Sequence, residues 1–284
     1  MKKYKPFFRA GMINFLAYRF SLLTWLIVTA LQVVCTVFLW LAVFKTSAEY
    51  QHIDINEVVI NGFTLKSVIV YFVFSNIFSF ITFGSDTMWN INEDIREGKI
   101  AVNIIKPISY RIRLLFTALG TSFGPTLIFG VPLSIIAYPV FVLTKMLIIT
   151  NIWMFLFNIL IFIILTVLAV TLSDSIQFFF GVLCFYTSSA WGLSMLKNTI
   201  TNFLSGSLLP LSFFKFGNFD LSKIVQFLPF AGLVQNPVLV LINQSTINQS
   251  IHYVGLSLVW IIIFEIINKL SFMRASKAIT VQGG

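Results

Sequence analysis

The feature that most constrains this chain is an uninterrupted apolar run. Residues 21–44 read SLLTWLIVTALQVVCTVFLWLAVF, and none of these 24 positions carries a charged side chain. A helix needs about 20 mostly apolar residues to cross the hydrocarbon core of a bilayer. Basic residues precede the run, as they would in a signal peptide, but the run exceeds the apolar region of about 7–15 residues that such peptides carry. It therefore predicts a membrane span that stays in the protein.

The composition extends this conclusion to the whole chain. Hydrophobic residues make up 58% of its 284 positions and charged residues only 10%, whereas a soluble domain carries about 25% charged residues. This excludes a water-soluble fold and predicts an all-α membrane protein. The formal net charge of +9 requires no nucleic-acid partner, because Lys and Arg accumulate beside the cytoplasmic ends of spans.

Further apolar runs are long enough to cross a membrane, so the sequence predicts six transmembrane helices. The predicted spans are residues 21–44, 64–84, 114–142, 151–173, 175–196 and 251–269. Several Gly and Pro residues interrupt the third. Asp174 separates the fourth span from the fifth, and its neighbours Ser173 and Ser175 predict a tight turn that Asp174 caps.

The distribution of Lys and Arg predicts the orientation. With six spans, thirteen of these residues fall on one face and six on the other. The thirteen are Lys2, Lys3, Lys5, Arg9, Arg19, Arg96, Lys99, Lys106, Arg111, Arg113, Lys269, Arg274 and Lys277, and the six are Lys45, Lys66, Lys145, Lys197, Lys215 and Lys223. Because the cytoplasmic face carries the excess, both termini and the loop after the second span are expected in the cytoplasm.

The segment before the first span, residues 1–19, has a helical pattern of its own. Phe8, Met12, Phe15 and Leu16 recur at the spacing of one helix face, with basic and polar residues between them. This pattern is typical of an amphipathic helix lying in the cytoplasmic interface. The alternative is a basic flank that only sets the topology.

The segment before the last span, residues 197–250, is apolar but broken. Its helix-breaking residues are Gly206, Pro210, Gly217, Pro229, Gly232 and Pro237. Backbone groups freed by such breaks cannot face hydrocarbon unsatisfied. We expect a re-entrant or interfacial pair of short helices on the extracellular side, with an ordinary long external loop as the alternative.

The densest charge cluster lies in residues 90–111, NINEDIREGKIAVNIIKPISYR, which hold seven charged side chains. Asn90 followed by Glu93 resembles a capping box, and Gly98 is placed to end a helix. The sequence therefore predicts a short helix over residues 91–97 within a cytoplasmic loop that spans residues 85–113.

Two apolar residues share one face of this short helix. Ile91 and Ile95 are too few to anchor it in lipid, and they suit a small knob that enters a groove on another protein. A solvated hairpin whose charges only enforce topology is the alternative. The acidic residues favour partner contact, since Asp and Glu contribute little to the orientation rule.

Other candidate sites are few. Glu265 lies within the sixth predicted span, where a carboxylate is a functional candidate, but Lys269 is placed for a helical ion pair with it. Cys35 and Cys184 fall in apolar runs, and no metal-ligand or catalytic spacing occurs. The polar residues within predicted spans either line a path or hold helices together; they include Gln32, Ser75, Asn76, Gln177, Thr187 and Ser188.

Two stretches carry a resemblance to a known family. One is IREGKIAVNIIKP (Ile95–Pro107), and the other is SGSLLPLSFF with VQFLPFAGLVQNPV (Ser205–Val238). In this order and topology the chain resembles the permease subunit of an ABC transporter of the ABC-2 type, as a single transmembrane domain over residues 1–284.

The resemblance implies roles for both stretches. The loop helix would be a coupling helix, with Asn92, Asp94, Ile95, Arg96, Glu97 and Lys99 in contact with a separate ATP-binding subunit. The second stretch would close the path from outside through Gly206, Pro210, Leu228, Pro229, Phe230 and Pro237. Two ATP-binding subunits and a second permease chain, identical or homologous, would complete the assembly.

The chain itself lacks a phosphate-binding loop of the form G-x-x-x-x-G-K-[ST]. No cofactor is therefore expected in this chain, ATP and Mg would reside in the partner subunit, and the chain alone is not expected to be an enzyme. The resemblance favours an exporter of an amphiphilic or hydrophobic cargo, such as a drug, peptide or lipid-like molecule. The Phe, Ile, Lys and Asn richness suggests an AT-rich genome and a bacterial plasma membrane. An ion-coupled secondary transporter is the alternative, and a membrane enzyme or scaffold is a third.

Overall fold

The computed structural model describes residues 2–17, 19–148, 151–187, 189–216 and 219–277. Over these residues the chain is built from helices, with two short antiparallel strand pairs at turns: β1 (Val59–Ile60) with β2 (Phe63–Thr64), and β3 (Lys215–Phe216) with β4 (Phe219–Asp220). The prediction of an all-α membrane protein agrees with this architecture.

Five helical stretches in the described residues are long and apolar enough to cross a membrane. They are α2 (Arg19–Gln51), α3 (Leu65–Phe83) with α4 (Thr87–Arg96), α6 (Tyr110–Pro125) with η2 (Thr126–Gly130) and α7 (Val131–Leu143), α8 (Ile152–Leu183), and α12 (Ile247–Lys277). The interrupted third span stays helical, because α6 continues through the π-helical turn η2 into α7.

The predicted turn at Asp174 is wrong. Helix α8 runs from Ile152 to Leu183 without a break, so residues 152–173 and residues 175–183 belong to one helix. The Asp174 side chain is fully buried and paired with an arginine, which removes the penalty that a charge inside an apolar helix would otherwise carry. What remains of the fifth predicted span is α9 (Ala190–Leu204), 15 residues long.

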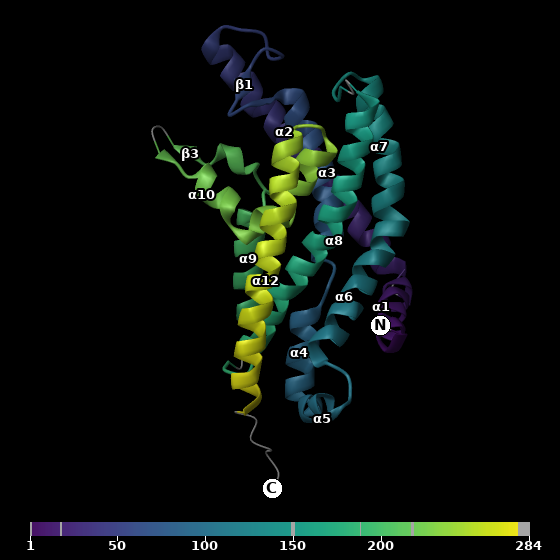
Figure 1. Ribbon diagram of the computed structural model, residues 1–284. Coiled ribbons are helices and arrows are strands. Elements are labelled where there is room, and N and C mark those ends of the chain that lie inside the picture. Colours follow the sequence, from purple (N-terminus) through teal and green to yellow (C-terminus); the bar gives the residue numbers. More distant parts are fainter. Residues whose placement is uncertain (1, 18, 149–150, 188, 217–218, 278–284) are drawn as a thin grey trace.

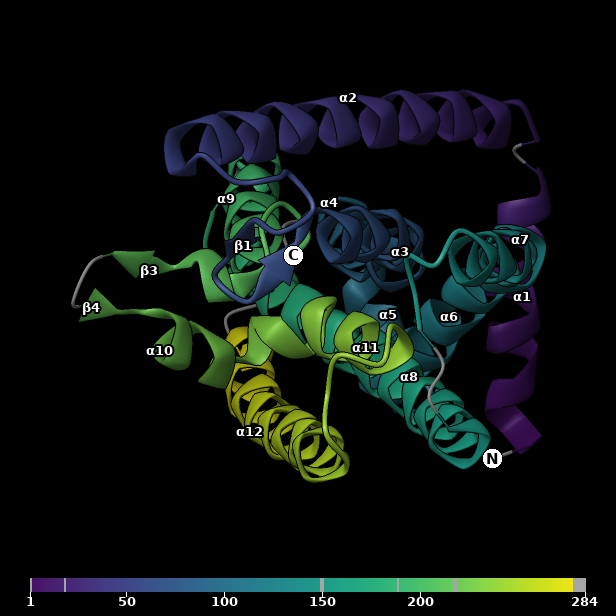
Figure 2. The same cartoon turned by 90° about the horizontal axis from the view of Figure 1, so that it is seen from above.

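The helices form an elongated bundle with two distinct ends (Figure 1). At one end lie α4, α5 (Lys99–Ile105) and the C-terminal end of α12, and at the other lies the β1–β2 turn. Figure 2 shows α2 crossing one side of the bundle, over α3, α4 and α9. Helix α7 has no fully buried residue, but one of its faces packs on α3, where Tyr138 and Phe141 contact the Phe74 ring.

The core lies where α3 and α8 meet the segment before α12. Tyr71 and Phe74 of α3, Leu172 of α8 and Val238 of α11 (Gln235–Leu241) are almost fully buried there. A leucine side chain gains little by leaving lipid tails, which are as apolar as it is. Packing between spans therefore stabilises the fold through close van der Waals contact more than through exclusion of water.

The N-terminal helix α1 (Lys5–Ala17), which follows η1 (Lys2–Tyr4), falls within the predicted residues 1–19. It packs on α6 through two glycines: a Cβ on Gly11 would lie 2.4 Å from the Thr117 carbonyl oxygen, and one on Gly120 would lie 2.1 Å from that of Phe8. Phe8 also contacts the Phe123 ring at 5.5 Å. The side chains of Phe15 and Leu16 lie outside the described residues.

The segment between α9 and α12 folds back into the bundle. It contains η3 (Leu211–Phe213), α10 (Ser222–Phe227), η4 (Pro229–Gly232) and α11, and the last two pack against α8 and α12. Ala231, Leu233, Val234 and Val238 are fully buried. The stretch that sequence marked as apolar but broken is therefore part of the packed interior.

Candidate functional site

The charged loop forms a helical hairpin. Helix α4 ends at Arg96, Gly98 adopts a left-handed backbone with φ +70°, and α5 follows at once from Lys99. The prediction that Gly98 ends the first helix is confirmed, because a residue without a Cβ takes this conformation without strain. The predicted capping box at Asn90 is wrong: α4 already begins at Thr87, directly after the break at residues 84–86.

Ile91 does not form an exposed knob. Its side chain is fully buried against α8, where a Cβ on Gly181 would lie 2.5 Å from the Ile91 Cδ1 atom. Ile95 is half-buried beside the same cluster. The prediction for Ile91 is wrong because this face of α4 is used to fasten the loop to α8.

Asp94 joins both helices of the hairpin to α6. Its Oδ2 atom accepts hydrogen bonds from Asn103 Nδ2 at 2.9 Å, from the Tyr110 hydroxyl at 2.9 Å and from Arg113 Nη2 at 3.1 Å. Lys106 Nζ donates to Asn103 Oδ1 at 2.8 Å and extends the set. The carboxylate predicted to contact a partner therefore holds the loop in a fixed shape.

The outer surface of the hairpin combines charge with apolar side chains. Of the predicted contact residues, Arg96, Glu97 and Lys99 are exposed and Asn92 is half-buried. Glu97 pairs with Lys99, and this hydrogen bond raises the pKa of the Lys99 ammonium.

Sequence reasoning missed the apolar part of this surface. Val102 and Ile105 of α5 are 61% and 84% exposed. Their spacing of three residues places them on one helix face. The prediction includes only one helix, over residues 91–97, and so this spacing is not interpreted as helical. Together, Arg96, Glu97, Lys99, Val102 and Ile105 are called the hairpin tip below.

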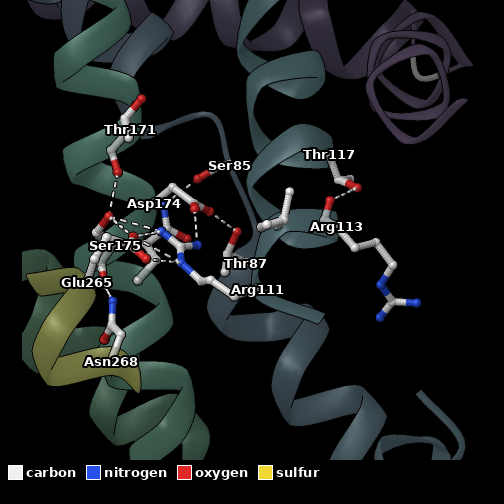
Figure 3. Close-up of polar contacts among 12 residues, drawn as sticks. Ser85, Thr87, Arg111, Arg113, Thr117, Thr171, Asp174, Ser175, Glu265 and Asn268 are labelled. Atoms are coloured by element: carbon white, nitrogen blue, oxygen red, sulfur yellow. Dashed lines mark hydrogen bonds and ion pairs between the residues drawn. The ribbon is translucent and has the colours of Figure 1, made fainter. Parts of the chain in front are cut away.

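A second ion network lies deeper, between α6, α8 and α12 (Figure 3). Arg111 pairs with Asp174 of α8 and with Glu265 of α12, whose carboxylate it contacts through Nε at 3.1 and 3.2 Å. The Ser175 hydroxyl donates to Glu265 Oε1 at 2.8 Å, and Thr87 of α4 donates to Asp174. The predicted ion pair of Glu265 with Lys269 is wrong.

The three Lys- and Arg-rich segments lie at the same end of the bundle. Lys3 Nζ donates to the Pro107 carbonyl at 3.4 Å, which places the N-terminal segment beside the loop. Phe272, near the end of α12, stacks on Tyr110 with ring centroids 5.5 Å apart. These contacts agree with the charge pattern that placed the three segments on one face.

The predicted gate residues lie on the segment between α9 and α12, which is called the returning segment below. Gly206 has φ +83°, and its carbonyl accepts a hydrogen bond from the Tyr71 hydroxyl at 2.6 Å. Pro210, Pro229 and Pro237 are buried, and Leu228 and Phe230 are half-buried. The backbone N–H of Gln235 donates to the Ser205 carbonyl at 3.0 Å, which joins two distant parts of the segment.

Some of the polar residues predicted within spans line cavities, and others do not. Gln32 and Asn76 line one cavity, and Gln177 lines another beside it. Ser75 is buried in α3 and Thr187 is half-buried, whereas Ser188 lies outside the described residues.

Comparison with family models decides the identity. The model of the ABC-2 family transporter protein matches residues 30–283, which covers both ion networks, the hairpin and the returning segment. The chain belongs to the ABC-2 transporter family. Comparison with curated proteins and with solved structures gave no match.

Membership of the ABC-2 family indicates what kind of work the described geometry serves. Such permeases are multi-pass membrane proteins and components of transport systems, not catalysts themselves, and the family normally works with an ATP-binding subunit. An ABC-2 permease therefore needs a surface for that subunit and a mechanical link from this surface to its spans.

Proposed function

We propose that this chain is the transmembrane subunit of an ATP-driven exporter in a bacterial plasma membrane. It forms the translocation path, with both termini and the α4–α5 hairpin in the cytoplasm. Two ATP-binding subunits, which carry ATP and Mg, dock on the hairpins of two permease chains that are identical or homologous. The cargo is an amphiphilic or hydrophobic molecule.

The observation that carries this proposal is the hairpin tip. It is the outermost part of α4 and α5 at the end of the bundle in Figure 1, and it combines three charged side chains with Val102 and Ile105. An exposed apolar pair with charges around it fits a groove on a partner protein.

A docking hairpin transmits force only if it is fixed to the spans. Asp94 ties it to α6, and Ile91 fastens α4 to α8. Arg111 then connects α6 to α8 and α12. Movement of the hairpin tip would therefore rotate or shift three spans together, which is how ATP binding would change access to the path.

The returning segment supports a role for its residues as the outer closure. Gly206, Pro210, Leu228, Pro229, Phe230 and Pro237 lie on the segment that folds back toward α3 and α8. We propose that this segment is the extracellular re-entrant element and seals the path when the spans rest in their inward-facing arrangement. With α9 and the residues after it counted as one crossing, the chain would cross the membrane six times.

Co-purification tests the proposal. The tagged chain is isolated from its native membranes in a mild detergent, and ATP hydrolysis in the eluate is measured. Ile105→Asp should remove most of the co-purifying activity, because a carboxylate replaces an apolar contact. Leu143→Asp is the matched control, since Leu143 is 82% exposed, comparable with Ile105, but lies at the far end of α7. Equal activity with both variants, or none with the unaltered chain, would refute the proposal.

An ion-coupled secondary transporter is favoured by one observation, the two carboxylates Asp174 and Glu265 within spans. Both already pair with Arg111, which favours a structural role over proton binding. Proton uptake by the purified chain alone in liposomes, abolished by Glu265→Gln, would support this function and displace the first.

A further inference from the structure

Two adjacent cavities open between the helices on the side covered by α2. The first, of about 250 Å³, lies between α3, α8 and α9, and the second, of about 410 Å³, lies between α2, α3 and α9. Phe83 and Asn202 line both cavities, so the two adjoin, and together they are called the paired cavity below. The paired cavity lies at the level where α3 breaks and α4 begins.

The two cavities differ in chemistry. The first is lined by hydroxyls and amides, among them Ser173, Gln177 and Asn198, and by the ammonium-bearing Lys197. The second is also lined by polar side chains, Gln32 and Asn76 among them, but it adds apolar surface from Val28, Phe80 and Leu208. Of the described residues that line either cavity, Lys197 alone carries a charge.

The Lys197 ammonium lacks a direct counter-ion. Within the described chain it forms no ion pair and no side-chain hydrogen bond, although its residue is half-buried. The charge of Asp86, in the break between α3 and α4, acts on it from a greater distance. A partly buried cation at membrane depth is unfavourable unless an anion or polar groups compensate it.

We propose that the paired cavity binds an anionic amphiphile, with its headgroup at Lys197 and its tail along the apolar side chains of the second cavity. The headgroup is a phosphate or a carboxylate, to which the Asn198 amide in the lining of the same cavity would donate a hydrogen bond. The inference rests on the proposed transport function, since it names the class of cargo that the permease would carry.

The polarity of the paired cavity supports this choice over a neutral lipid. A neutral tail would leave the Lys197 ammonium without a direct counter-ion, whereas an anion pairs with it. A hydrophilic anion alone would have no contact with the apolar side chains of Val28 and Leu208, which line the second cavity. Charge and apolar surface together therefore fit one molecule that has both.

Native mass spectrometry of the full chain in a neutral detergent tests the inference. Three probes share an oleoyl tail: lysophosphatidate carries a phosphate, oleate a carboxylate, and monoolein is neutral. We expect both anions, or one of them, to bind about tenfold more tightly than monoolein, because a charge-assisted contact is lost in the neutral probe. The arm that binds more tightly identifies the headgroup.

Four variants locate the site. Lys197→Gln should weaken binding of the anions about tenfold and leave monoolein unchanged, and Lys197→Arg should retain binding. Asp86→Asn should strengthen binding about threefold, because it removes a competing negative charge. This gain also keeps the test decisive if Lys197→Gln folds poorly. Lys223→Gln, at an exposed position on α10, is the control and should change nothing.

Equal binding of monoolein and the anions, or unchanged anion binding in Lys197→Gln, would overturn the inference. Neither result depends on ATP or on a partner subunit. If the ATPase co-purifies but the anions show no preference, only the cargo class is wrong. If the anions bind at Lys197 but no ATPase co-purifies, the coupling proposal is wrong instead.

Discussion

Two arginines on α6 lie two positions apart and serve different networks. Arg113 turns toward the hairpin and pairs with Asp94, whose side chain is 15% exposed. Arg111 turns into the bundle and pairs with Asp174, which is fully buried, and with Glu265. Figure 3 shows the two side chains leaving α6 in different directions.

The difference separates a buried network, which makes the fold rigid, from a network near the end of the bundle that water can reach. In the deep network one guanidinium pairs with two carboxylates on two other helices, so its loss leaves the buried Asp174 charge without a cation where water cannot easily reach it. In the hairpin network two neutral donors, Asn103 and Tyr110, bind one carboxylate together with Arg113, near the end of the bundle. We therefore expect the deep network to hold the fold and the hairpin network to hold the coupling shape.

The largest expected effect is from Arg111→Gln. It leaves Asp174 and Glu265 without a cation and should lower the free energy of unfolding by about 3–5 kcal/mol, which a thermal denaturation series in detergent would measure. Adding Glu265→Gln and Asp174→Asn should recover part of the loss, because the carboxylates are then neutral. A single variant as stable as the unaltered chain would remove the distinction between the two networks.

Asp94→Asn should have an intermediate effect. Loss of the charge weakens three hydrogen bonds, including the one from Arg113, and should destabilise the chain by about 1.5–3 kcal/mol. Co-purifying ATPase activity should fall further than the melting temperature suggests, since the hairpin shape is disturbed. If Asp94→Asn destabilised the chain as much as Arg111→Gln does, and ATPase activity fell no further than the loss of folded protein explains, the assignment of Asp94 to the coupling shape would be contradicted.

Glu265→Gln should have a smaller effect on stability, about 1 kcal/mol, because Arg111 keeps Asp174 as a partner and Ser175 still donates to the new amide oxygen. Transport driven by ATP should persist. Loss of transport in a variant that melts normally would instead give this carboxylate a direct role in ion coupling.

The smallest effect is expected from Lys99→Gln. The pair with Glu97 is exposed to water and screened by salt, so the melting temperature should not change. Assembly with the ATP-binding subunit should become more sensitive to ionic strength in a titration of co-purification against salt. A clear drop in melting temperature would show that the hairpin tip also supports the fold.

The sequence predicted those features that depend on local pattern. Apolar runs located the long helices, Gly98 located the end of α4, and the Lys and Arg count grouped the segments that lie at one end. The family resemblance also came from contiguous stretches, and the family match over residues 30–283 confirms it.

The features that sequence missed depend on distant partners. Asp174 looks like a turn residue until Arg111, 63 positions earlier, is seen beside it. Glu265 looks paired with Lys269 because helical spacing is visible in sequence, whereas its contact with Arg111 spans 154 positions. Ile91 and Ile95 looked equivalent, but the packing of α4 on α8 buries the first completely.

The central claim is that the hairpin tip docks the ATP-binding subunit, and site-directed cross-linking tests it most directly. Cys35 and Cys184 are replaced by Ser, and Val102→Cys or Tyr50→Cys is introduced. Tyr50 is 87% exposed at the opposite end of the bundle and serves as the control. With a short bifunctional reagent in native membranes, position 102 should give an adduct with the ATPase subunit and position 50 none. An adduct from position 50 with none from position 102 would contradict the account.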